Sequence, residues 1–218
     1  MLESEAPTIS RAERNKRDKR ERIMRAAREL FRRHGFERTT ISEIAERADV
    51  GKGTLFLYAG SKEELLVMFF REDVGRSIDR GFNTVPQAPL VDQVMHVFGV
   101  MLDQNRRNLD LGRTFVKEVP FVGGDRHAIG EVMSGFYGRM SMLIEQAQAR
   151  GEVPREIAPR ALAHNLFALY FFMLLGWLGG SVRAQPEAAL REMVELQFFG
   201  FGKNPGPARP SRKAAKSR

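Results

Sequence analysis

The chain of 218 residues is 43% hydrophobic and has a formal net charge of +8, so it can bury the core of one medium domain or of a small and a larger one. It contains no cysteine, which excludes a disulfide framework and a thiolate metal site. The charge is uneven: residues 1–62 carry a net +5, residues 63–202 a net −3 and residues 203–218 a net +6. Such a concentrated basic excess is what a nucleic-acid partner predicts, and a merely solubilising charge pattern is the alternative.

The first segment is polar and basic. Residues 1–16 are predicted to form a flexible basic arm, and the Arg/Lys-rich stretch from Ser10 to Arg22 belongs either to that arm or to an early extension of the first helix. The N-terminus lacks the apolar region of a signal peptide, so we expect a cytoplasmic protein. An apolar stripe at helical spacing then predicts a helix that ends at Gly35. The stripe consists of Ile23, Ala26, Ala27, Leu30 and Phe31.

Residues 39–66 have the pattern of a helix-turn-helix followed by the start of a supporting helix. Thr40 and Glu43 have the spacing of a capping box, and apolar residues follow at helical spacing. The turn is predicted at residues 49–51, with Gly51 adopting backbone angles that other residues resist.

The second helix of this motif, from about Lys52 to Tyr58, is too short to be stable alone and has to be held by packing. Ser61 and Glu64 predict a second capping box that opens the next helix at Lys62. In a helix-turn-helix the second helix enters the major groove of DNA, so this segment predicts a DNA-binding surface.

The rest of the chain is predicted to be all-helical, because no alternating strand pattern of any length appears. The run from Ala161 to Leu178 contains His164 and Asn165 and is shorter than the roughly 20 residues of a membrane span, so it predicts a helix buried on nearly every side and no membrane partner. Residues 203–218, with three prolines and six basic residues, are predicted to be a disordered tail. Beyond the helix that starts at Lys62, helices are expected near residues 90–102, 109–119, 129–147, 158–178 and 188–199.

The helix-turn-helix segment resembles the DNA-binding domain of the TetR (tetracycline-repressor) family. The family's usual pattern has Ser at the position of Gly51 and an aromatic residue at that of Ala59. The residues that carry the resemblance are Ala27, Leu30, Phe31, Gly35, Thr39, Thr40, Ile44, Ala45, Ala48, Val50, Lys52, Gly53, Thr54, Leu55, Tyr58, Ser61, Lys62, Leu65 and Leu66.

The resemblance implies an all-α protein with a helix-turn-helix domain over residues 17–65 and a helical effector-binding and dimerisation domain over residues 66–202. It also implies a homodimeric regulator of transcription, commonly a repressor, that leaves a palindromic operator in double-stranded DNA when a small apolar effector binds. Two-fold symmetry matches two recognition helices to an inverted repeat.

The candidate DNA contacts lie at helix starts and on the second helix of the motif. Thr40, Lys62 and the backbone at Lys52 and Gly53 are predicted to touch phosphates, since helix N-termini attract anions. Side chains farther along the recognition helix are placed for base edges or thymine methyl groups. The full set is Thr40, Lys52, Gly53, Thr54, Phe56, Leu57, Tyr58 and Lys62.

The effector pocket and the dimer surface follow from the resemblance, with placement in the chain's own core as the alternative for each residue. Met and Phe line adaptable apolar pockets. The pocket candidates are Phe98, Met101, Phe115, Phe136, Met140, Asn165, Phe167, Tyr170 and Met173. The dimer candidates, on the last two helices, are Leu174, Trp177, Leu178, Leu190, Val194, Phe198 and Phe201.

An enzyme is not predicted, and neither is a cofactor or a metal. The histidines His34, His96, His127 and His164 have no metal-ligand spacing, and no P-loop, dinucleotide fingerprint or nucleophile motif occurs. Two alternatives remain open: a nucleoid-type protein that binds DNA without sequence preference, and a helical protein-interaction module without DNA specificity. Selection of bound fragments from random DNA would separate them.

Overall fold

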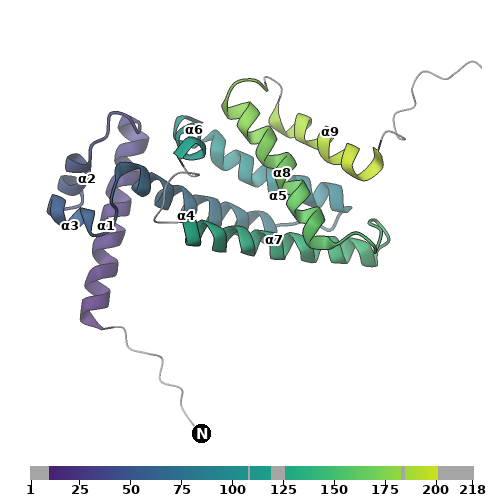
Figure 1. Ribbon diagram of the computed structural model, residues 1–218, viewed down its shortest axis with the longest axis horizontal. Helices are drawn as coiled ribbons and strands as arrows, with labels where there is room; N and C mark the ends of the chain where they lie inside the picture. The colour runs from purple at the N-terminus through teal and green to yellow at the C-terminus, as the bar shows by residue number, and fades with distance from the viewer. Residues whose placement is uncertain (1–9, 108, 119–125, 183–184, 201–218) are drawn as a thin grey trace, which may run out of the picture.

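The computed structural model describes residues 10–107, 109–118, 126–182 and 185–200, and over these residues the protein is purely helical, as predicted (Figure 1). α1 to α3 form a group at one end, α5 and α7 to α9 form a bundle at the other, and α4 runs from the first group into the second. The helices are α1 (Arg11–His34), α2 (Ile41–Arg47), α3 (Lys52–Phe56), α4 (Lys62–Asn83), α5 (Leu90–Arg106), α6 (Leu109–Glu118), α7 (Arg126–Ala149), α8 (Pro159–Leu178) and α9 (Pro186–Phe199).

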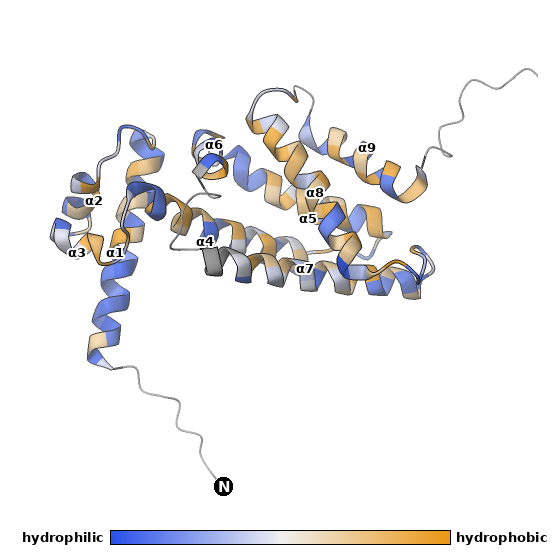
Figure 2. Ribbon diagram, in the orientation of Figure 1, coloured by the Kyte–Doolittle hydropathy of each residue, from blue (hydrophilic) through white to orange (hydrophobic). Residues whose placement is uncertain are grey.

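α1 begins at Arg11 because a capping box precedes it. The Ser10 hydroxyl accepts the Glu13 N–H, and the Glu13 carboxylate accepts the Ser10 N–H at 3.0 Å. Residues 11–16 are therefore helical, so they extend the first helix and are not part of a flexible arm; residues 1–9 lie outside the described residues. The first buried side chain is Ile23, and the N-terminal half of α1 projects as a hydrophilic helix (Figure 2).

The turn between α2 and α3 differs from the prediction. Gly51 has an ordinary φ of −65° and is the N-cap of α3, whereas Asp49 adopts the left-handed φ of 52°. A short polar side chain such as Asp tolerates this conformation better than most residues do. The Asp49 carboxylate also accepts a hydrogen bond from Arg22 of α1 at 3.1 Å, which ties the turn to the first helix.

The two predicted capping boxes have different outcomes. At α2 the box is complete: the Thr40 hydroxyl accepts the Glu43 N–H, and the Glu43 carboxylate accepts the Thr40 N–H at 2.8 Å. At α4 the Ser61 hydroxyl accepts the Glu64 N–H at 3.0 Å, but the Glu64 carboxylate accepts the N–H of Gly60 at 2.7 Å. The α4 box is therefore only half formed, and Glu64 closes the preceding turn instead.

Two hydrophobic clusters form the interior. The N-terminal core joins α1, α2, α3 and the first half of α4, and it includes Leu111 of α6. Leu66, Phe69 and Phe70 belong to this core, so the N-terminal packing unit extends beyond residue 65, where the sequence-based boundary was placed. The C-terminal core joins the second half of α4 with α5, α7, α8 and α9.

α8 is less buried than predicted. Its exposed apolar side chains include Phe172, which is 69% exposed. Only 39% of the most apolar 18-residue stretch of α8 is buried. By length and composition alone α8 could cross a membrane, but one such helix is weak evidence because core helices of soluble proteins share these properties. Here α8 packs against α6, α7 and α9, and one apolar face remains uncovered.

Candidate nucleic-acid interface and ligand cavity

The recognition helix α3 is held by its inward side. Leu55 is fully buried in the N-terminal core, and its N–H donates to the Gly51 carbonyl at 3.0 Å. The turn before it is fixed by the Val50 N–H, which donates to the Ala45 carbonyl at 3.0 Å. Packing on one side therefore supplies the stability that a five-residue helix lacks by itself.

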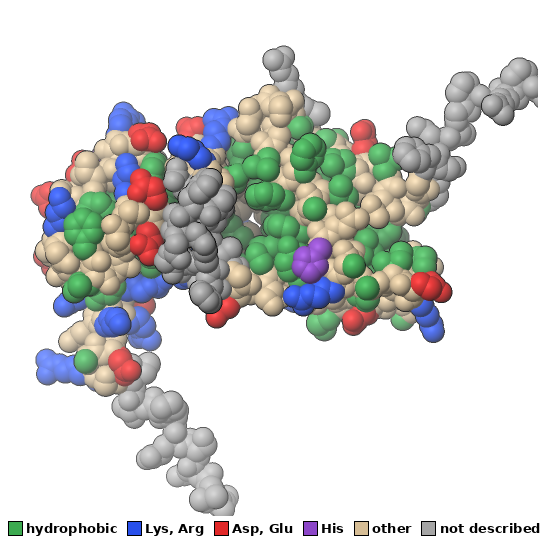
Figure 3. All heavy atoms as spheres, viewed as in Figure 1, with side chains coloured by type: hydrophobic (Ala, Val, Ile, Leu, Met, Phe, Trp, Pro, Cys, Tyr) green, Lys and Arg blue, Asp and Glu red, His purple; other side chains and the backbone are tan. Residues whose placement is uncertain are grey.

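The outward side of α3 and the residues just after it present the predicted contact groups. Lys52 and Gly53 are exposed, and Thr54 and Tyr58 are half-buried. Apolar side chains are also exposed here: Phe56 is 46% exposed and Leu57 is 84% exposed. Figure 3 shows hydrophobic side chains gathered at this end of the molecule, over α2 and α3. Such side chains are suited to contact thymine methyl groups in a major groove.

Thr40 and Lys62, both predicted to touch phosphates, already have partners within the chain. The Thr40 hydroxyl donates to the Glu43 carboxylate at 2.8 Å. The Lys62 ammonium donates to the carbonyls of Phe36, at 2.9 Å, and Glu37, at 3.4 Å, and it lies 4.2 Å from the centre of the Phe36 ring. Lys62 thereby fastens the start of α4 to the loop between α1 and α2, and its contact with a phosphate stays a prediction.

A cavity of about 230 Å³ lies between α4, α5, α6, α7 and α8. Four of the predicted pocket residues line it: Met101, Phe115, Phe167 and Tyr170. The remaining candidates do not. Phe98, Phe136, Met140 and Met173 are buried within the C-terminal core, where they fill space, and Asn165 is exposed on α8.

The cavity wall also contains residues that sequence reasoning missed. Val132, Met133 and Tyr137 come from the apolar stripe of α7, and Val74 comes from α4. Burial raises the pKa values of Tyr137 and Tyr170, so both phenols are neutral at physiological pH. The polar lining residues are Arg71, Ser77, Gln104 and Asn105.

Asn105 shows which signal could have revealed the cavity. It is a buried polar residue on an otherwise apolar helix face, and its amide donates to the Met101 carbonyl at 3.1 Å. Polar residues buried beside an apolar space are typical of ligand sites, where a few such groups orient a mostly apolar ligand. The pair Gln104 and Asn105 at the end of an apolar stripe was therefore an informative pattern in the sequence.

Phe115 connects the cavity to the DNA-binding end. It lines the cavity, and its ring stacks on that of Phe70 with centroids 4.8 Å apart and an interplanar angle of 15°. Phe70 belongs to the N-terminal core, as does Leu111 on the same helix α6. A change in the cavity thus has a direct apolar path to the core that holds α3.

The predicted dimer surface is largely occupied within the chain. Leu174, Leu178, Leu190 and Val194 are buried in the C-terminal core, so no second chain can contact them in this packing. Trp177 and Phe198 are half-buried against the same core, and Phe201 lies outside the described residues. The exposed apolar side chains of the last two helices are instead Phe172 and Leu175 on α8 and Leu196 and Phe199 on α9.

Comparison with known proteins bears directly on the DNA-binding end. Residues 23–68 match the family model described as bacterial regulatory proteins, tetR family. The fatty acid metabolism regulator protein of Bacillus subtilis is 21% identical over 85% of this chain and 97% of its own length. The transcriptional repressor KstR of Mycolicibacterium smegmatis is 28% identical over 87% of this chain and 91% of its own length.

A solved structure matches most of the chain. FadR of Thermus thermophilus, a TetR-family repressor in complex with lauroyl-CoA, superimposes with a TM-score of 0.68 and 26% identity over 88% of this chain and 100% of its own. These relatives are regulators of transcription and not enzymes. Over residues 23–68 the chain therefore carries the N-terminal module of the tetR family of bacterial regulatory proteins, and it is a DNA-binding regulator of transcription.

Proposed function

We propose that this regulator is a cytoplasmic, homodimeric repressor that binds a palindromic operator and releases it when an acyl-CoA thioester occupies the cavity. One observation carries the proposal: the apolar cavity shares Phe115 with the packing around the DNA-binding core. The lauroyl-CoA complex of the similar Thermus thermophilus FadR supports the ligand class.

The cavity favours a slender apolar chain. Its walls are mainly Val, Met, Phe, Tyr and Leu side chains, and its volume of about 230 Å³ lies below the roughly 300–1,000 Å³ of pockets for drug-sized ligands. Ser77, Gln104 and Asn105 offer a few hydrogen-bonding groups, which suit the polar end of an acyl chain. A bulky rigid ligand has no room there unless the helices move apart.

The operator would be read by the outward side of α3. Leu57 and Tyr58 are our candidates for base contacts, and the backbone at Lys52 and Gly53 for phosphate contacts, because no side chain caps α3 and its first N–H groups remain available to an anion. Thr40 and Lys62 would act mainly by holding α2 and α4 in place, with any phosphate contact made by the same groups.

The dimer would form through the uncovered face of α8 and α9. Phe172, Leu175, Leu196 and Phe199 leave a run of apolar side chains exposed on these helices. Figure 3 shows hydrophobic side chains gathered over α8 on the viewed face. An apolar surface of this kind marks an interaction site more often than a solvated face. Dimerisation by this face also gives the two recognition helices the symmetry that an inverted repeat requires.

The ligand would act through α4 and α6. α4 contributes Val74 and Ser77 to the cavity. It contributes Leu65, Leu66, Met68, Phe69 and Phe70 to the N-terminal core. α6 adds the Phe115–Phe70 stack. A ligand that displaces either helix changes the separation of the two recognition helices, and it can weaken DNA binding only by preferring the displaced arrangement.

The test uses the full-length protein and an operator selected from random duplex DNA. Fluorescence anisotropy would measure operator affinity alone and with dodecanoyl-CoA, coenzyme A or dodecanoate. We expect dodecanoyl-CoA to weaken operator binding by about 5- to 150-fold, the usual range of allosteric coupling. Val132→Phe, which narrows the cavity, should reduce this effect, while Met142→Phe on the exposed face of α7 should not.

Two results would reject the proposal. Equal affinity for random and selected duplexes would identify a nucleoid-type protein. Tight binding of dodecanoyl-CoA without any change in operator affinity would show that the cavity is not a sensor for DNA release.

A further inference from the structure

A second hollow, of about 230 Å³, is lined by five arginines, one aspartate and one glutamine. Arg28 and Arg32 come from α1, Arg76 and Arg80 from α4, and Arg107 from the end of α5. We call this site the arginine hollow. It lies where the DNA-binding end meets the ligand-binding bundle, and no residue of α2 or α3 contributes to it.

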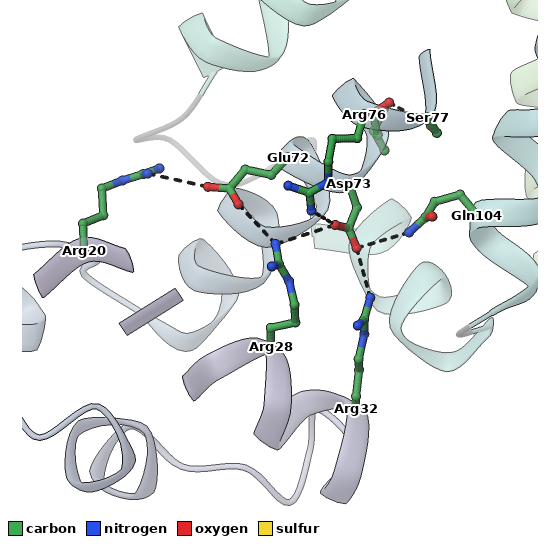
Figure 4. A network of polar contacts seen from close by, with 9 residues as sticks. Arg20, Arg28, Arg32, Glu72, Asp73, Arg76, Ser77 and Gln104 are labelled. Atoms are coloured by element: carbon green, nitrogen blue, oxygen red, sulfur yellow. Dashed lines mark hydrogen bonds and ion pairs between the residues drawn. The ribbon is translucent and has the colours of Figure 1, made fainter. Parts of the chain in front are cut away.

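Asp73 is the acidic residue of the lining, and it is only 5% exposed. Its carboxylate faces Arg28 at 3.6 Å and Arg32 at 3.3 Å, pairs with Arg76, and accepts the Gln104 amide at 3.1 Å (Figure 4). One carboxylate thus has three guanidinium groups around it.

Glu72 does not neutralise the excess positive charge of the arginine hollow. It lies beside Asp73 and pairs with Arg28 at 3.2 Å and with Arg20 at 3.6 Å, so it brings a further arginine with it (Figure 4). With Glu72 and Arg20 included, six arginines lie near two carboxylates, so positive charge remains in excess. Guanidinium groups that line one hollow repel one another, and a bound anion would offset the repulsion that the two carboxylates leave uncompensated.

Part of the hydrogen-bonding capacity of the hollow is unused. Arg28 Nε is buried and has no hydrogen-bond partner. Within the part of the chain that the structure describes, neither Arg80 nor Arg107 has a carboxylate partner. Unsatisfied buried donors are uncommon in folded proteins, so the Arg28 Nε is a candidate donor to a bound ligand.

We propose that the arginine hollow is a binding site for a ligand that carries phosphate groups. A guanidinium group presents a planar fork of N–H donors that matches the oxygens of phosphate, and several arginines are needed to balance a multiply charged anion. The bound phosphates would connect Arg28 and Arg32 of α1 to Arg80 of α4 and to Arg107, which directly follows α5.

Two sources could supply the same chemistry. Gln104 lines both the arginine hollow and the apolar cavity, so the phosphates of a coenzyme A thioester could lie in the hollow while its acyl chain lies in the cavity. A free polyphosphate or nucleotide is the other source. The phosphate site itself does not rest on the proposed repressor function, because its residues and charges are separate from the apolar lining apart from Gln104.

Isothermal titration calorimetry of the full-length protein at constant ionic strength would test the site with pyrophosphate, adenosine 3′,5′-bisphosphate, coenzyme A, dodecanoyl-CoA and, as the ligand without phosphates, dodecanoate. The test variant is Arg80→Gln with Arg107→Gln, which alters exposed side chains without carboxylate partners. The matched control is Arg155→Gln with Arg160→Gln, which removes two exposed arginines outside the hollow. Thermal unfolding would show that both variants remain folded.

We expect saturable binding of at least one phosphate ligand, weakened at least tenfold in the test variant and unchanged in the control. Binding of pyrophosphate would identify a site for free phosphates. Binding of dodecanoyl-CoA alone, with dodecanoate equally bound by both variants, would identify a site for the phosphates of the thioester.

The proposal fails if no phosphate ligand loses affinity in the test variant, or if the control loses as much. It also fails if the test variant weakens only duplex DNA, because the hollow would then belong to the DNA interface. Since pyrophosphate binding is measured without operator, a failure here is distinguishable from a failure of the repressor mechanism.

Discussion

Replacing Phe115 with alanine should separate ligand binding from DNA release. Phe115 is half-buried, lines the cavity and stacks on Phe70 of the N-terminal core. The substitution removes the stack but leaves every other cavity residue in place. Ligand would still enter, while its displacement of α6 would no longer reach Phe70.

The cost in stability can be bounded. Phe→Ala at a fully buried site costs about 3–5 kcal/mol, and an aromatic pair contributes about 0.5–1.5 kcal/mol beyond area burial. Phe115 is only half-buried and already borders an empty space, so we expect a loss near 2 kcal/mol, roughly half of the core figure. Urea unfolding of the full-length protein would measure it.

The decisive quantity is the ratio of operator affinities without and with dodecanoyl-CoA, measured by anisotropy. We expect Phe115→Ala to bring this ratio close to one while ligand binding itself weakens only a few-fold. Val132→Ala is the matched control, because Val132 also lines the cavity but packs against the C-terminal core. Its ratio should remain near that of the wild type.

The opposite pattern would refute the reasoning. If Phe115→Ala retains the wild-type ratio and Val132→Ala loses it, the signal does not pass through the Phe115–Phe70 stack. Transmission through α4 alone would then account for the coupling.

Four further predictions concern other parts of the molecule. Leu57→Ala should leave urea unfolding unchanged and weaken operator binding more than random-duplex binding in anisotropy, because Leu57 is 84% exposed. Phe172→Glu should shift the protein to a monomer in analytical ultracentrifugation; an intact dimer would exclude the α8 face. Asp49→Ala should lower the free energy of unfolding, measured with urea, by about 1–2 kcal/mol because the backbone at residue 49 has a left-handed φ. Asp49→Gly should lower it less. Hydrogen bonds from the Thr40 side chain and backbone lower the pKa of Glu43 from its ordinary value. Its contribution to stability is therefore present above the ordinary pKa of a glutamate and lost as the pH falls through the lowered pKa. Acid unfolding followed by circular dichroism would measure this contribution, which should be missing in Glu43→Gln.

Local signals in the sequence were sufficient to predict the helices, including those of the DNA-binding end. The Thr40–Glu43 capping box and the end of α1 at Gly35 involve residues close together in the chain, so their geometry is encoded locally. The turn was the exception. Both Asp49 and Gly51 tolerate a left-handed conformation, and the long-range partner Arg22 lies 27 residues away, beyond what a local pattern reveals.

The cavity and the dimer face could not be predicted residue by residue, because both depend on how helices are rotated against one another. Phe98 and Phe167 occupy similar positions in apolar stripes, yet the first fills the core and the second lines the cavity. On α9, Val194 is buried whereas Leu196 is exposed. Hydrophobicity alone does not distinguish a side chain that packs within its own chain from one that is exposed to a second chain.

The recognition helix has one further consequence, for how such regulators diversify. α3 is anchored through Leu55, while Lys52, Gly53, Phe56 and Leu57 contribute nothing to the N-terminal core. The four outward positions, which we propose read DNA, are therefore distinct from Leu55, which maintains the fold. A library that varies only the outward positions should yield mostly folded proteins with altered operator preferences, so new target sites can be explored without loss of structural integrity.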